Sequence, residues 1–487
     1  MTTSAGIGST AIARLLPDLG AQPGPRYRAL SSALAALLLD GRLTDGLRLP
    51  SERDLAAELG ISRATTTAAY EDLSAQGLMA RRRGSGSYLQ LPVTARVTGP
   101  GSRIARQQPA PGTLNLSVAC LPSLPSVMES ATLAAAEDIG RFTRQDGYFP
   151  YGIDELRIAV AARYSDRGVP TEAAQILITN GAQHGFDLIL RSILSPGDRV
   201  LTESPTYPGA LEAITAHHGR VVPVPLSEEW SWDTRAIENM LAQTAPRLAY
   251  LIPDFHNPTG ALVDSAARDR VASAARRCGT RLVIDESFID IDLRPDEERA
   301  QPPTPMAALD QSVFSIGSLS KPVWGGLRIG WVRATAADVQ RLATVRARAD
   351  MSGAVVDQLI ALRVLADLNL IAGQRRAVLT VQRDLPLAAL ADQLPGWRLR
   401  RPDGGLSAWV ELDAPAATPL ANLLEQRGVL ITPGSRFTVD GALERYLRIP
   451  FALPSAELVR AVGIIAAAWH DLRPKSLAQR QGSLITT

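Results

Sequence analysis

Residues 20–90 carry apolar side chains at helical spacing, punctuated by residues that start and stop helices. Across residues 26–43 one helical face collects the leucines Leu30, Leu34, Leu37 and Leu38. Two further helices are predicted after it, because Ser51 and Ser62 are good N-caps and Gly60 can end the first of the two in a left-handed conformation. Two capped helices joined by a short turn are typical of a helix-turn-helix motif.

A basic hairpin is predicted directly after these helices. The stretch LMARRRGSGSYL, residues 78–89, contains a short strand, three arginines, a Gly-Ser-Gly turn and a second strand. Such a hairpin suits a wing that contacts the DNA backbone or the minor groove. Two plainer interpretations stay open, since many capped helix pairs are only structural and a run of arginines can form a solvated surface.

The pattern changes after residue 90. Residues 91–113 hold four prolines and three glycines with no helical period, which predicts an extended linker. Residues 114–475 alternate short apolar runs with longer amphipathic segments, and this alternation favours an α/β domain with a mainly parallel sheet. The predicted strands of that sheet are residues 176–179, 200–202, 249–252, 282–284 and 313–315. Residues 476–487 are polar, and we expect them to form a loose tail.

Composition narrows the classes of protein. The 487 residues are 46% hydrophobic and 21% charged, which excludes a disordered chain. The net charge is only +2, so a nucleic-acid site must be a local basic patch. Cys120 and Cys278 lie too far apart for a metal motif, and we expect both to be small buried residues in a reducing cytoplasm. Without a signal-peptide pattern or a long apolar run, the sequence predicts a soluble, cytoplasmic protein with no metal.

Lysine is scarce, and this scarcity draws attention to one position. Of the 51 basic residues only Lys321 and Lys475 are lysines. Lys321 follows an apolar strand, with Ser318 three residues before it and Arg328 seven residues after it. A lysine can form a Schiff base with an aldehyde cofactor, while a nearby hydroxyl and guanidinium can hold a phosphate. The alternative is an ordinary surface lysine.

Three other segments offer chemistry that a phosphorylated pyridine cofactor needs. The segment TNGAQ starts a helix at residues 181–183, where backbone N–H groups suit a phosphate. Asp285 ends a buried strand, and a carboxylate there can pair with a protonated pyridine nitrogen. Asn257 lies at the carboxyl end of another strand, where ligand sites of such sheets gather. Alone, each is also explained as a common turn or an acidic strand end.

The N-terminal region resembles the winged-helix domain of the GntR regulator family. The residues LPSERDLA, ELG, SR, AYEDL, QGL and GSGSYL match that family almost throughout from Leu49 to Leu89. The resemblance implies contacts with double-stranded operator DNA at Arg53, Arg63, Thr65, Arg83, Gly84 and Gly86. Many members have arginine where this chain has Thr67, which leaves one base or phosphate contact in doubt.

The C-terminal region resembles fold-type I aminotransferases, which use pyridoxal 5'-phosphate (PLP). The motifs occur in the family's order: Y-x-P-x-G, G-A-Q, S-P-T-Y-P-G, N-P-T-G, D-E, S-x-S-K with an arginine seven residues on, and a late R-I-P. The resemblance implies that Lys321 forms the Schiff base with PLP and that Asp285 pairs with its pyridine nitrogen. It further implies that Asn257 bonds the phenolic oxygen and that Tyr207 stacks on the ring.

The resemblance also implies residues for the phosphate, the partner subunit and the effector. The phosphate would be held by Ala182, Gln183, Ser318 and Arg328. Tyr148 would reach the phosphate of a neighbouring subunit, which implies a homodimer. Arg448 would bind the carboxylate of an amino-acid ligand.

One position departs from the aminotransferase pattern. These enzymes usually place a tyrosine hydroxyl against the phenolic oxygen, two or three residues after the aspartate, where this chain has Ser287 and Phe288. Phenylalanine cannot donate that hydrogen bond. Our hypothesis is that its presence raises the pKa of the lysine–PLP imine and weakens chemistry while sparing binding.

The order of the two regions is similar to the MocR subfamily of bacterial regulators. The expected fold is multidomain: a GntR-type winged helix-turn-helix domain over residues 20–90, mainly α-helical with a β wing, and an α/β aminotransferase-like domain over residues 114–475. The resemblance implies a head-to-tail homodimer whose larger domain senses PLP itself or an amine or amino-acid effector. Two other hypotheses remain: a working aminotransferase with an appended DNA-binding domain, and a regulator in which PLP is purely structural.

Overall fold

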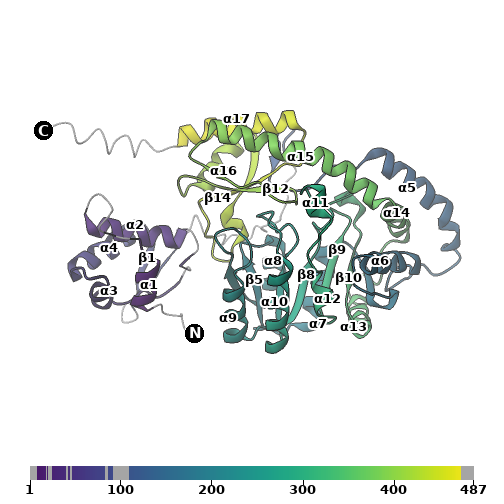
Figure 1. Cartoon of the computed structure of the whole chain (residues 1–487), viewed down its shortest axis with the longest axis horizontal. Coiled ribbons are helices and arrows are strands. Elements are labelled where there is room, and N and C mark those ends of the chain that lie inside the picture. Colours follow the sequence, from purple (N-terminus) through teal and green to yellow (C-terminus); the bar gives the residue numbers. More distant parts are fainter. Residues whose placement is uncertain are drawn as a thin grey trace.

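The computed structural model describes residues 8–17, 19, 25–39, 42–43, 46–82, 86–90 and 109–472. These residues form an N-terminal helical region with a β-hairpin, and a larger α/β region with two sheets (Figure 1). The predicted tail, residues 476–487, and most of the predicted linker lie outside the described residues. No helix in the described ranges is long and apolar enough to cross a membrane.

The N-terminal region has the helices and the hairpin that the sequence predicts. Its elements are α1 (Ser9–Leu15), α2 (Arg26–Leu39), α3 (Glu52–Leu59), α4 (Arg63–Ala75), β1 (Met79–Arg82) and β2 (Gly86–Leu89). The Ser51 side chain accepts the Asp54 N–H and the Ser62 side chain accepts the Thr65 N–H, so both predicted N-caps are confirmed. Gly60 has a φ of 62°, the left-handed cap that a glycine allows.

The core of this region extends before the predicted domain start at residue 20. Helix α1 contributes Ile12, which is fully buried together with Leu30, Leu34 and Leu55. This helix has only seven residues, and Ile12 is its one buried side chain. Strands β1 and β2 pair in antiparallel register, with Met79 opposite Leu89, as a wing requires.

A seven-stranded sheet forms the middle of the larger region. Its strands are β4 (Ile176–Thr179), β5 (Arg199–Ser204), β6 (Arg220–Pro225), β7 (Leu248–Leu251), β8 (Arg281–Asp285), β9 (Phe314–Ser318) and β10 (Gly330–Arg333). They lie in the order β4-β10-β9-β8-β7-β5-β6, and only β10 runs antiparallel to its neighbours. The prediction of a mainly parallel sheet is therefore confirmed.

Helices cover both faces of this sheet. Tyr250 of β7 packs in one core cluster with α7 (Ala182–Ile193), α8 (Pro208–Ala216) and α13 (Ala336–Arg346). The adjacent residue Ala249 packs in another cluster with α9 (Thr234–Thr244) and α10 (Ser265–Cys278). This alternation explains the continuous apolar runs of the strands, since both faces are buried. Near β4 and β10 lie α5 (Pro125–Asp138), α6 (Asp154–Asp166) and α14 (Val355–Ala366), and the short helices α11 (Asp296–Arg299) and α12 (Met306–Leu309) lie between β8 and β9 in the chain.

A second, five-stranded sheet completes the region. Its order is β11-β12-β14-β13-β3, from β11 (Arg398–Leu399), β12 (Ser407–Glu411), β14 (Tyr446–Pro450), β13 (Val429–Pro433) and β3 (Leu114–Leu116). Helices α16 (Ala417–Gln426) and α17 (Ser455–Leu472) pack on it, and α15 (Leu368–Gln393) contributes to its core and to the core beside β4. Strand β3 brings the chain just after the predicted linker into parallel register with β13.

Candidate functional site

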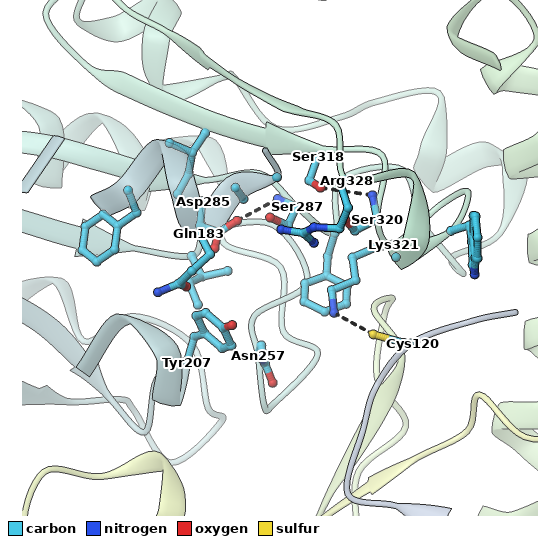
Figure 2. A pocket seen from close by; sticks show the side chains of 18 of the residues that line it. Cys120, Gln183, Tyr207, Asn257, Asp285, Ser287, Ser318, Ser320, Lys321 and Arg328 are labelled. Carbon is cyan, nitrogen blue, oxygen red and sulfur yellow. Dashed lines mark hydrogen bonds between the residues drawn. The ribbon is translucent and has the colours of Figure 1, made fainter. Parts of the chain in front are cut away.

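Eight of the residues predicted for the cofactor line one cavity of about 320 Å³ (Figure 2). The cavity lies where the carboxyl ends of β5, β7, β8 and β9 meet the first turn of α7. Parallel strands deliver their last residues to the same edge of a sheet, which is where ligands bind in folds of this kind. The eight residues are Ala182, Gln183, Tyr207, Asn257, Asp285, Ser318, Lys321 and Arg328.

The amine of Lys321 points into this cavity instead of lying on the surface. Its Nζ donates to the Ala119 carbonyl at 3.0 Å, lies 3.6 Å from Cys120 Sγ and is 5.2 Å from the centre of the Phe288 ring. The expectation that Cys120 is simply buried is wrong, because it lines the cavity and is partly accessible. Cys278 is also only partly buried, at the end of α10.

Arg375 of α15 fixes the turn that carries Lys321. Its guanidinium donates to the carbonyl of Pro322 at 3.1 Å and to that of Val323 at 2.7 Å. It also donates to Pro122 O at 2.6 Å, beyond the Ala119–Cys120 segment. Arg375 thus holds together the turn after Lys321 and the segment of residues 119–122, which meet at the lysine amine.

Asp285 is held in place by two hydrogen bonds. The Tyr250 hydroxyl donates to Oδ2 at 2.5 Å, and the Ser287 N–H donates to Oδ1 at 2.9 Å. Burial, reinforced by the Asp285 carboxylate, raises the pKa of Tyr250 well above its ordinary value, so Tyr250 keeps its proton and acts as the donor. The role of Tyr250 could not be predicted from the sequence, because its partner lies 35 residues away on the next strand.

An anion site is formed at the start of α7. Gly181 precedes the helix with a φ of 82°, and a side chain there would meet the Arg328 guanidinium, 3.0 Å from the position of a Cβ. Arg328 donates to the Asn180 carbonyl at 2.6 Å and is otherwise exposed toward the cavity. Free backbone N–H groups, a positive helix end and a guanidinium suit a phosphate. Ser318 lies alongside, donating to Ile329 O at 3.3 Å.

Asn257 and Tyr207 come from two loops at the same edge of the sheet. Asn257 Oδ1 is buried and has no hydrogen-bond partner within the described part of the chain. Tyr207 caps α8, and a Cβ on Gly209 would lie 2.6 Å from its ring, so only glycine fits under it. Gln183 donates from its side chain to Gly209 O at 3.1 Å, which ties α7 to α8.

Tyr148 and Arg448 do not line the cavity. Tyr148 is 57% exposed, and its N–H bonds the Asp146 side chain at 3.0 Å. Arg448, on β14, donates to the Ser117 carbonyl and to Thr432 Oγ1, and its guanidinium lies 5.1 Å from the centre of the Phe437 ring. Ser117 is only two residues from Ala119, whose carbonyl accepts from Lys321.

Phe288 occupies the cavity wall beside the lysine amine. The ring is 6% exposed, and Ser287 lines the same cavity. The departure noted in the sequence therefore lies within the site.

The residues predicted to contact DNA differ in how far their side chains are exposed to solvent. Arg53 and Arg63 are exposed on α3 and α4, while Thr65 shares a 2.8 Å contact with the Ser62 hydroxyl. Thr66, the next residue of α4, is fully buried and cannot reach a base.

Thr67 is turned toward the protein. Its hydroxyl donates to Glu52 Oε2 at 3.3 Å, and Arg81 of β1 pairs with Glu52 Oε1 at 2.9 Å. Glu52 thus connects α4 to strand β1 of the hairpin. Arg83 and Gly84 lie outside the described residues, and Gly86 begins β2 with a φ of 111°.

Comparison with known proteins separates the two regions in the same way. The model of the family "Bacterial regulatory proteins, gntR family" matches residues 26–89, and that of "Aminotransferase class I and II" matches residues 113–465. A curated relative, the uncharacterised HTH-type transcriptional regulator YisV of Bacillus subtilis, is 27% identical over 91% of this chain and 95% of its own.

Enzymes match a smaller share of the chain. The 2-aminoadipate transaminase of Thermus thermophilus is 30% identical over 68% of this chain and 85% of its own. The crystal structure of the α-aminoadipate aminotransferase LysN from the same organism, complexed with N-(5'-phosphopyridoxyl)-L-leucine, is 28% identical and covers 74% of this chain and 93% of its own, with a TM-score of 0.65. A kynurenine aminotransferase of Pyrococcus horikoshii shares the fold, with a TM-score of 0.68 at 22% identity over 74% of this chain and 92% of its own. The chain therefore belongs to the aminotransferase class I and II family and carries a gntR-family DNA-binding region ahead of it, the combination expected of the MocR subfamily of HTH-type transcriptional regulators.

Proposed function

We propose that this protein is a transcriptional regulator that binds operator DNA through its N-terminal region and holds PLP at Lys321. PLP itself, or an amine or amino acid that reaches it, is the signal. One observation carries this proposal: the amine of Lys321 shares a cavity with a strand-end carboxylate and an anion site, in a chain that begins with a DNA-binding region.

The cavity has the polar groups that a phosphorylated pyridine aldehyde needs. Asn257 Oδ1 is buried without a partner among the described residues, and a buried amide in that state favours a polar ligand beside it. A half-turn of the amide would present an N–H to a phenolic oxygen instead. The Arg328 guanidinium and the start of α7 together fit a phosphate, so the donor set agrees with PLP.

Bound PLP supplies an aldehyde that reacts with primary amines and a ring that withdraws electrons. Lys321 is the amine of this chain that links to it. Asp285, oriented by Tyr250 and Ser287, would pair with the ring nitrogen and hold a proton there. Tyr207 would stack on the ring, and the phosphate would be held by Ala182, Gln183, Ser318 and Arg328.

The segment from Ser117 to Cys120 couples the cofactor to an effector. It accepts hydrogen bonds from Arg448 at one end and from Lys321 at the other. The carboxylate of an amino acid competes with the Ser117 carbonyl for Arg448, and its amine competes with Lys321 for the cofactor. A ligand that replaces both contacts binds more tightly when the segment of residues 117–120 has released Arg448 and Lys321 than when it still holds them. Such a difference in affinity between two conformations is what a ligand needs in order to shift the balance between them.

The working unit in this proposal is a head-to-tail homodimer. Tyr148 supports it, because a tyrosine that is largely exposed and remote from its own cavity is free to meet the phosphate of a second copy. In such a dimer the signal reaches the DNA-binding regions through the linker of residues 91–113.

Two measurements on the wild-type protein test the proposal. Adding PLP should produce the visible absorbance of a lysine-bound cofactor, and borohydride reduction followed by peptide mapping should locate it at Lys321. Gel mobility shifts on the intergenic DNA beside the protein's own gene should change when PLP or an amino acid is added. Absence of the visible band, or a shift that no ligand alters, would reject the sensor.

A working aminotransferase is the second candidate, and the complete set of cavity residues favours it. Phe288 in the wall counts against it, because no hydroxyl from that position can assist the phenolic oxygen. Steady keto-acid production at ~1 per second or faster with an added amino acceptor would establish turnover. An absorbance spectrum that no amine changes would instead favour a structural cofactor.

A further inference from the structure

Glu203 is a buried carboxyl beneath the cofactor cavity, and none of the roles above uses it. It is the penultimate residue of β5 and is 2% exposed. Its Oε1 accepts two hydrogen bonds of 2.8 Å, from the Ile252 N–H at the end of β7 and from the Trp232 indole. One carboxyl oxygen thus joins the ends of two neighbouring strands.

The other oxygen, Oε2, faces the two loops that carry cofactor residues. The Thr206 hydroxyl donates to it at 3.4 Å, and His256 Nε2 lies 3.7 Å away. Thr206 immediately precedes Tyr207, and His256 immediately precedes Asn257. The carboxyl therefore contacts the loop of Tyr207, the residue proposed to stack on the cofactor ring. It also lies beside the loop of Asn257, the residue proposed to bond the phenolic oxygen.

His256 contacts Thr259 through its other ring nitrogen. Its Nδ1 lies 3.0 Å from the Thr259 hydroxyl, which also lies 3.3 Å from Trp230 O. Its Nε2 is the ring nitrogen that lies 3.7 Å from Glu203 Oε2. A neutral imidazole and a carboxyl that keeps its proton can face each other there without an uncompensated buried charge.

We propose that Glu203 is a positioning residue that sets the spacing of Tyr207 and Asn257 around the cofactor ring. It acts through Thr206 on one loop and beside His256 on the other, while Ile252 and Trp232 anchor it. This inference rests on the proposed cofactor role of the cavity and adds a residue that does not touch the cofactor.

The charge state of the pair agrees with this geometry. Burial raises the pKa of Glu203 to about 7, against the lowering effect of the hydrogen bonds from Ile252, Trp232 and Thr206. Burial lowers the pKa of His256 to about 3. Between about pH 3 and pH 7, a protonated carboxyl faces a neutral imidazole, and an amide at position 203 mimics that carboxyl.

Two pairs of variants test the inference in the full-length protein. Glu203→Ala removes every contact, whereas Glu203→Gln keeps an acceptor for Ile252 and Trp232 and an N–H₂ group for the loops. Thr206→Val removes one hydroxyl that donates to Glu203. Its matched control is Thr202→Val on β5, since Thr202 is equally buried and its hydroxyl has no hydrogen-bond partner in the described residues.

The readouts are PLP affinity, the visible circular dichroism of the bound cofactor and the unfolding midpoint. We expect Glu203→Ala to weaken PLP binding by ~10-fold or more and to reduce the visible dichroism, and Glu203→Gln to stay within ~3-fold of wild type. Thr206→Val should weaken binding by ~3-fold or more, while Thr202→Val should leave it unchanged.

Each outcome decides the question. Variants at Glu203 and Thr206 that change only the unfolding midpoint would overturn the positioning role and leave the proposed function intact. A wild-type protein that shows no PLP binding would overturn both. If Glu203→Ala does not fold, the threonine pair decides: a loss confined to Thr206→Val supports the inference, and equal results for the two threonines overturn it.

Discussion

The proposed role of Lys321 in holding the cofactor depends more on the groups around its amine than on the scarcity of lysine in the chain. The carbonyl of Ala119, the sulfur of Cys120 and the ring of Phe288 surround its amine. The contacts with Ala119 and Cys120 cross about 200 positions of chain, so the sequence could indicate the lysine but not these neighbours. Asp285 and Asn257 were predictable because strand ends are local patterns, whereas Tyr250 and Glu203 become visible only when β5, β7 and β8 are placed side by side.

Restoring the missing hydroxyl should change the protonation of the lysine–cofactor imine. Phe288→Tyr should lower the imine pKa by about one unit, because a hydrogen bond to a charged oxygen contributes ~1.5 kcal/mol and favours the deprotonated imine. Phe288→Leu, which adds no donor, should leave the pKa unchanged. A pH titration of the visible spectrum measures both variants, and equal values for all three proteins would contradict the explanation offered for this position.

Glu203 and His256 should make the stability of the fold depend on pH in opposite ways. The Glu203 pKa is raised from 4.5 to about 7, so its contribution is complete below pH 4.5 and is lost as the pH rises to about 7. The His256 pKa is lowered from 6.5 to about 3, so the stability it contributes is complete above pH 6.5 and is lost as the pH falls to about 3. Tyr250, the other titratable group near Glu203, keeps its proton throughout this range.

Glu203→Gln should therefore gain stability relative to wild type by about 3 kcal/mol between pH 4.5 and pH 7, at ~1.4 kcal/mol per pH unit. Urea unfolding across this pH range measures the difference, in which the titration of all other groups cancels. Glu228→Gln, an exposed control from the loop before Trp232, should run parallel to wild type. A Glu203→Gln profile that is also parallel would show that Glu203 titrates as an ordinary carboxyl.

At the scale of elements, the helix-turn-helix pair was the most predictable part of the chain. Ser51, Gly60 and Ser62 act through hydrogen bonds within three or four residues, and such signals are local. Strand β6 was missed because it contains two prolines, which an edge strand tolerates. Helix α1 was missed because it is only seven residues long, although Ile12 and Leu15 at helical spacing both join the core.

Arg63 should contribute to DNA binding from the first turn of α4. Arg63→Ala should weaken affinity for operator DNA by ~10-fold and reduce the slope of log affinity against log salt by about one. Arg26→Ala, at an exposed position of α2 outside the helix pair, should change neither quantity. Fluorescence anisotropy at several salt concentrations compares them, and similar losses in both variants would reduce the role of Arg63 to net charge.

At the scale of the whole molecule, the chain joins a gntR-family region to a larger region that holds the cavity. The family of each region followed from local motifs, and the comparisons confirmed both. The return of the chain at β3 to pair with β13 could not be foreseen, since the two strands lie more than 300 positions apart. That pairing matters, because it places Ser117, Ala119 and Cys120 between Arg448 and Lys321.

The proposed regulation depends most on Lys321, which connects the cofactor to DNA binding. The decisive measurement is the affinity of wild type and Lys321→Ala for the intergenic DNA beside the gene, each with and without PLP. Without PLP the two proteins should bind equally, because Lys321 lies in the larger region. PLP should change the wild-type affinity by at least ~5-fold, the usual lower end of coupling between two sites, and leave that of Lys321→Ala unchanged. An equal response of the two proteins, or none in wild type, would contradict the account.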